Sequence, residues 1–131
     1  MISIMLDNDI VGYRDLFDGT LHSAGWHEYR LFEFISMDEA GIASDAPDSE
    51  IWRLCQQRGF LLLTANRNLD DDSSLEQTLR QENTPDSLPV ITVSAPQRIV
   101  EPEYRARCIH ALIGIVLDLE NCLGAARLYI P

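Results

Sequence analysis

Oxygen-bearing side chains gather at the ends of short apolar runs, and these residues could do chemistry together. Asp7 and Asp9 follow the apolar residues 2–6, and Asn66 and Asn68 follow the run at 60–64. Asp48 opens a segment with helical spacing. Carboxylate and amide oxygens are the ligands that hard divalent cations prefer. The pattern is consistent with a metal site, with a working site of another kind, or with ordinary turns.

Each candidate also has a structural explanation. Asp7 could cap the following helix, and Asp48 could complement the positive end of its own helix. Asn66 and Asn68 could form turns, while Thr64 could satisfy the end of its strand. For the nearby arginines, exposure or ion pairing is the alternative to binding a phosphate, and the acidic run 70–72 is typical of a solvated loop.

The elements that would position these side chains alternate along the chain. Strands are predicted at residues 2–6, 28–35, 60–64, 89–94 and 127–130. Four helices are predicted between the strands. The first is capped by Asn8 or Asp9, the second runs from 47 to 58, the third begins at a capping box at 73–76, and the fourth runs from about 102 to 123. A further capping box at 36–39 marks a short turn. This alternation predicts an α/β fold: a three-layer α/β/α sandwich, Rossmann-like, with a mostly parallel sheet of about five strands.

In a parallel α/β sheet, ligands bind beyond the carboxyl ends of the strands. That edge would collect the polar residues directly after each apolar run. The set comprises Asp7, Asn8, Asp9, Asp38, Asn66, Asn68, Ser94 and Arg98. Asp48 and Glu50, at a helix start on the same side, could join them.

Composition limits the classes of function. The chain has 131 residues, 21 acidic against 10 basic, all ten of them arginine, and a formal net charge of −11. Such a charge opposes unaided binding to nucleic acid, so either metal ions screen the acids or the partner is of another kind. A single domain spanning 1–131 is expected. No apolar run reaches the ~20 residues of a membrane span, and the start lacks the features of a signal peptide, so a soluble, cytoplasmic protein is expected.

The three cysteines are odd in number and lack a C-x-x-C spacing, which favours free thiols over a disulfide or metal role. A glycine-rich phosphate loop, a G-x-S-x-G elbow and lysine are all absent from the sequence. Phosphoryl or acyl chemistry on a Rossmann-like sheet therefore finds no support.

Three motifs taken in order resemble the PIN-like domain, in particular small stand-alone bacterial PIN-like proteins. They are Asp7 after the first strand, Asp48-Ser49-Glu50-Ile51 at a helix start, and Thr64-Ala65-Asn66-Arg67-Asn68 after a buried strand. The resemblance covers nearly the whole chain. It implies a Mg²⁺- or Mn²⁺-dependent ribonuclease, often the toxin of a toxin–antitoxin pair, in which clustered carboxylates hold a cation that activates water.

The resemblance assigns roles to individual residues. It implies catalytic positions at Asp7, Asp48 and Asn66, and metal ligands at these three together with Asp9 and Asn68. The expected substrate-binding residues are Thr64, Arg67, Ser94 and Arg98. The third acidic position departs from the family, because Asn66 and Asn68 bring no negative charge and would hold a cation less strongly.

Two functions of different kinds follow. The first is a metal-dependent nuclease acting on RNA through a weakened acidic site. The second is an inactive PIN-like protein that serves as a binding or regulatory module, with an antitoxin-like protein or a second copy of itself, as a homodimer, for its partner.

Overall fold

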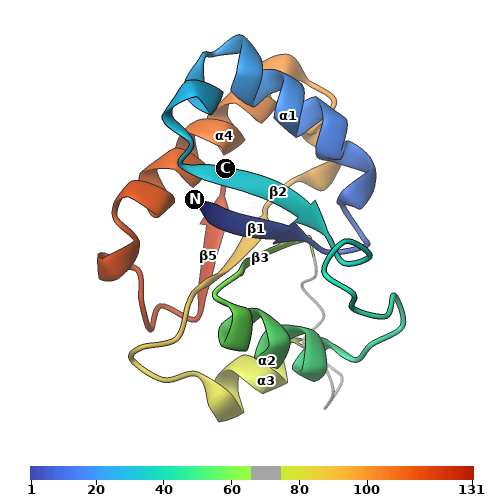
Figure 1. The fold of residues 1–131 in the computed structure, drawn as a ribbon, viewed down its shortest axis with the longest axis vertical. Coiled ribbons are helices and arrows are strands. Elements are labelled where there is room, and N and C mark those ends of the chain that lie inside the picture. The colour runs from blue at the N-terminus through green and yellow to red at the C-terminus, as the bar shows by residue number, and fades with distance from the viewer. Residues whose placement is uncertain (66–74) are drawn as a thin grey trace.

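The computed structural model describes residues 1–65 and 75–131, and it contains a five-stranded sheet in which every pair of neighbouring strands is parallel. The strand order is β2-β1-β3-β4-β5 (Figure 1). The strands are β1 (Ile2–Leu6), β2 (Phe32–Ser36), β3 (Leu61–Thr64), β4 (Val90–Val93) and β5 (Arg127–Ile130). The predicted α/β class and the predicted parallel sheet are confirmed.

Helices cover both faces of this sheet (Figure 1). The pair α1 (Arg14–Ser23) and α4 (Pro102–Leu117) packs on one face, and the pair α2 (Asp48–Arg58) and α3 (Leu75–Glu82) packs on the other. Side chains of a strand alternate between the faces: in β3, Leu61 and Leu63 join the core beneath α1 and α4, whereas Leu62 joins the core beneath α2 and α3. The result is the predicted three-layer sandwich.

Local signals in the sequence explain several boundaries. Helix α2 follows Pro47, carries Asp48 and Glu50 in its first turn, and ends at Gly59, whose left-handed φ of 72° suits glycine. The capping box predicted after β2 forms in both directions: Glu39 N–H donates to Ser36 Oγ (3.0 Å), and Ser36 N–H donates to the Glu39 carboxylate (2.9 Å).

The strand predicted at 28–35 was placed too early. Residues Trp26–Tyr29 form a 3₁₀ turn, and Arg30 follows it with a left-handed φ of 50°, so that the extended chain begins only at Phe32. Residues 27–30 are exposed and have no face to bury in the sheet. Aromatic strand propensity was therefore outweighed by the reversal that connects α1 to β2.

Two helix boundaries also differ from the prediction. Neither Asn8 nor Asp9 caps a helix by its side chain; the chain enters α1 through a 3₁₀ turn at Val11–Tyr13. Helix α4 ends at Leu117 rather than near 123, and a second 3₁₀ turn, Leu119–Asn121, follows it. Asn121 donates to the Asp118 carboxylate at 2.6 Å, which stabilises this turn in place of another helical one. The capping box predicted at 73–76 begins outside the described residues.

The thiols are free, as predicted: Cys55 and Cys108 are buried and Cys122 is half-buried. Among the described residues, no helix combines the length and apolar character needed to cross a bilayer.

Candidate metal centre at the carboxyl edge of the sheet

The carboxylates of Asp7 and Asp9 meet at the hydroxyl of Thr64. Thr64 Oγ1 lies 2.9 Å from Asp7 Oδ2 and 3.3 Å from Asp9 Oδ2. The backbone N–H of Ala65 donates to the same Asp9 oxygen at 3.1 Å, and the N–H of Asn8 donates to Asp7 Oδ1 at 2.7 Å. One hydroxyl proton is therefore shared between two acidic side chains at the edge where β1 and β3 end.

Strand register brings these residues together. Leu6 of β1 lies opposite Leu63 of β3, and the Asp7 N–H continues the ladder by donating to Leu63 O at 2.9 Å. Asp7 and Thr64 thus leave neighbouring strands side by side. Ile10 then closes a turn, because its N–H donates to Asp7 O at 3.0 Å while its side chain is fully buried. This turn directs Asp9 back towards the end of β3.

The pKa values of Asp7 and Asp9 are both raised, as expected for acidic side chains that lie close together and are partly buried. Burial raises the pKa of Asp7, and the charge of Asp48 adds to that rise, although hydrogen bonds from Thr64 and Asn8 oppose it. The pKa of Asp9 is raised from 3.8 to about 6, first by desolvation and then by the charge of Asp7. Most of the Asp9 residue is exposed to solvent, but its carboxyl group faces the Thr64 hydroxyl. A bound cation would reverse both shifts.

Asp48 lies within electrostatic reach of this pair. Its charge raises the pKa of both Asp7 and Asp9. At the same time its Oδ2 accepts the backbone N–H of Leu75, the first residue of α3, at 3.1 Å. Asp48 therefore belongs to the rim and also caps a different helix from its own, a role that its position in the sequence did not indicate.

The other predicted substrate-binding residues have partners of their own. Arg98 forms an ion pair with Glu101 (3.2 Å) and stacks 4.7 Å above the ring of Tyr104. The N–H of Ser94 donates to Ile130 O at 2.9 Å, which places it at the carboxyl end of β4. Asn66, Arg67 and Asn68 lie outside the described residues, so the predictions on them stay predictions.

The donor set of the described residues fits a hydrated magnesium or manganese ion. Mg²⁺ commonly keeps several waters and is held by one or two carboxylates, which is what Asp7 and Asp9 supply. Among residues 1–65 and 75–131, no group of three or more histidine, cysteine or acidic side chains is arranged to hold a metal ion.

Sequence reasoning missed two contacts that shape the rim. It treated Thr64 as a strand end or a substrate contact, whereas the hydroxyl joins Asp7 to Asp9. It also missed that Asn8 Nδ2 donates to Ser44 O at 3.2 Å, which ties the loop before α2 to the turn after β1. The sequence does offer a signal for the first contact: a threonine ends one buried strand, and an aspartate follows the neighbouring strand.

No protein-family model, no curated protein and no solved structure matches this chain.

Proposed function

We propose that the protein is a magnesium- or manganese-dependent ribonuclease of the PIN-like type with a weakened acidic site. The observation that carries the proposal is the Asp7–Thr64–Asp9 arrangement at the carboxyl edge of a parallel sheet. Two acids with raised pKa values are poorly stabilised without a cation. Ligands of parallel α/β folds bind at this edge.

Each acidic residue has a distinct role in this proposal. Asp7 and Asp9 would hold the cation, and Asp48 would add negative charge beside them while one of its oxygens accepts the Leu75 N–H. When bound, the cation lowers the pKa of a water molecule and neutralises charge on the phosphodiester. Thr64 orients both carboxylates, because its hydroxyl is fully buried and fixed between them.

The charge of the chain limits the substrate. With a formal net charge of −11, the protein repels the phosphates of a long duplex. A short single-stranded RNA presents fewer phosphates, and the metal itself supplies the attraction. We therefore expect cleavage of single-stranded RNA that needs millimolar manganese or magnesium.

The test is a cleavage assay with a fluorescent single-stranded RNA, with manganese or with EDTA. Activity should require the metal and should be lost in Asp7→Asn, which keeps an oxygen for the Thr64 hydroxyl. The control Asp86→Asn removes the same charge from an exposed residue that precedes β4, on the opposite edge of the sheet, and should remain active. Activity that persists in EDTA or in Asp7→Asn would overturn the proposal.

A second variant tests the departure at the third acidic position. The double change Asn66→Asp and Asn68→Asp adds two anionic oxygens, and it should tighten manganese binding if these side chains face the cation. Equal affinity in the double variant and the wild type would remove both asparagines from the proposed ligand set.

The alternative is an inactive PIN-like binding or regulatory module with an acidic protein-binding surface. Arg98 favours it, because its guanidinium is paired with Glu101 rather than left for a phosphate. Manganese binding by the wild type together with no RNA cleavage under any metal condition would select this function, with an antitoxin-like protein or a second copy as the partner to seek.

A further inference from the structure

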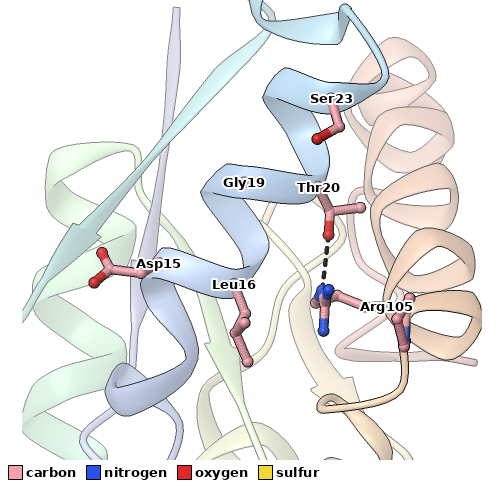
Figure 2. A pocket seen from close by; sticks show the side chains of 7 residues that line it. Asp15, Leu16, Gly19, Thr20, Ser23 and Arg105 are labelled. Atoms are coloured by element: carbon pink, nitrogen blue, oxygen red, sulfur yellow. Dashed lines mark hydrogen bonds between the residues drawn. The ribbon is translucent and has the colours of Figure 1, made fainter.

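A groove of about 420 Å³ lies between α1 and the first turn of α4 (Figure 2). These two helices cover the face of the sheet opposite to α2 (Figure 1). The lining of the groove includes Leu16, Gly19, Thr20, Ser23, Pro102 and Arg105. The volume lies in the range of small-molecule pockets. The groove belongs to different elements from the acidic rim, and it has a different chemical character.

Arg105 is fixed in the wall of this groove by neutral oxygens. Its Nε donates to Thr20 Oγ1 at 2.7 Å (Figure 2), and its Nη1 donates to the carbonyls of Ile99 (2.9 Å) and Val100 (3.3 Å). These contacts hold the guanidinium plane in one orientation. The contacts to Thr20, Ile99 and Val100 leave Nη2 as the part of the fork available to a ligand.

The partners of Arg105 are unusual for an arginine of this chain. Three arginines of the described residues are half-buried: Arg14, Arg105 and Arg127. Arg14 pairs with Glu39, and Arg127 pairs with Glu76 at 3.2 Å, whereas no carboxylate of residues 1–65 or 75–131 forms an ion pair with Arg105. Among the described residues, the guanidinium charge of Arg105 is therefore held by neutral oxygens and is not balanced by an ion pair.

Gly19 lines the groove and carries no side chain that would fill it. Glycine inside a helix is less favourable than alanine, because the unfolded chain loses more conformational freedom at glycine. Neither the backbone nor the packing demands it, because Gly19 has an ordinary helical φ and nothing lies within 4 Å of the position of an added Cβ. Its missing side chain leaves open space along the lining of the groove.

The rim of the groove is partly apolar. Two apolar residues, Leu16 and Pro102, line the groove, and Leu16 is 38% exposed. Asp15 also lines the groove, but Figure 2 shows its carboxylate directed away from Arg105. A ligand with one anionic group and an apolar body would therefore meet complementary surfaces at both of its ends.

We propose that this groove binds a small organic carboxylate. The carboxylate pairs with the guanidinium of Arg105 beside Thr20, and the apolar body lies over Gly19 against Leu16. A carboxylate oxygen can accept a charge-assisted hydrogen bond from Nη2, the guanidinium nitrogen that the contacts to Thr20, Ile99 and Val100 leave available. The site is separate from the proposed nuclease centre, and it stands whether or not the protein cleaves RNA.

The test is a heteronuclear NMR titration of the full chain with hexanoate as the probe. Saturable shifts should appear at the amides of Gly19, Thr20 and Val100, and they should be much smaller with hexanol, which lacks the charge, and with acetate, which lacks the tail. Inorganic phosphate, added separately, shows whether any anion suffices. Equal affinities for phosphate and hexanoate would overturn the assignment to apolar carboxylates.

Two variants and one control test whether hexanoate binds at Arg105 and Gly19. Arg105→Gln should weaken hexanoate binding roughly tenfold or more, since a charge-assisted bond is lost, while Arg107→Gln, at an exposed position of the same helix, should not. Gly19→Leu should block the groove without disturbing Arg105, which covers the case in which Arg105→Gln unfolds the protein. Undiminished binding in Gly19→Leu, or no saturable shift in the wild type, would refute the proposal.

Discussion

Replacing Asp9 by asparagine is expected to stabilise the metal-free protein at neutral pH. The pKa of Asp9 is raised from 3.8 to about 6 by desolvation and by the charge of Asp7, so its ionised form is less favourable in the folded protein than in the unfolded chain. Without solvent screening, this rise in pKa corresponds to a loss of roughly 3 kcal/mol in the free energy of unfolding at neutral pH. Asp9 is partly exposed, and solvent screening reduces the expected effect to about 1 kcal/mol. Asparagine keeps an oxygen to accept from Thr64 and Ala65.

The pH dependence of this effect has a defined sign. A carboxyl whose pKa is higher in the folded state contributes its stability fully below the unfolded pKa and loses it as the pH rises through the folded pKa. The gain in unfolding free energy from Asp9→Asn should therefore be near zero below pH 3.8, the ordinary pKa of aspartate, and it should reach its full size above about pH 6. Urea unfolding of both proteins in EDTA at a series of pH values measures it.

Two comparisons make this experiment decisive. Asp86→Asn removes one charge at an exposed residue and controls for the general effect of net charge. Manganese should stabilise the wild type more than Asp9→Asn, because only the wild type gains a full pair of anionic ligands. If Asp9→Asn were less stable than the wild type at neutral pH in EDTA, the crowding of the two carboxylates would be refuted.

Two further predictions concern the rim and the core. Thr64→Val should destabilise the protein by about 1–3 kcal/mol near neutral pH, because it removes the hydroxyl that donates to Asp7. Urea unfolding measures this change, and an unchanged unfolding midpoint would contradict the hydrogen bond between Thr64 and the two carboxylates. Burial raises the pKa of Cys55 to about 12 and that of Cys108 to about 11, so a thiol reagent at mildly alkaline pH should modify only Cys122 in the folded protein and all three after unfolding.

The sheet was predictable because its strands are continuous apolar runs. The predicted bounds 2–6 and 127–130 coincide with β1 and β5, and the runs around β3 and β4 differ from the structure by one residue at most at each end. Buried parallel strands carry apolar residues on both faces, so they stand out without any periodicity. The strand misplaced at 28–35 shows the limit, since its first half has aromatic propensity but no buried face.

The position of Asp7 and Asp9 at the carboxyl edge of the sheet was predictable, whereas their contacts were less so. The carboxyl-edge rule indicated Asp7 and Asp9 from sequence alone. The hydrogen bonds from Thr64 to these residues depend on the register between two strands that are far apart in the chain, which local patterns do not specify. The same holds for Asp48, whose bond to Leu75 joins the starts of two helices. Long-range pairing of this kind follows from packing rather than from local composition.

Isothermal titration of manganese into the wild type and Asp7→Asn tests the central claim most directly. If the carboxyl edge is a cation site, the wild type should show saturable binding with a stoichiometry of one, and Asp7→Asn should lose it while Asp86→Asn retains it. Identical binding isotherms for the wild type and Asp7→Asn would contradict the claim.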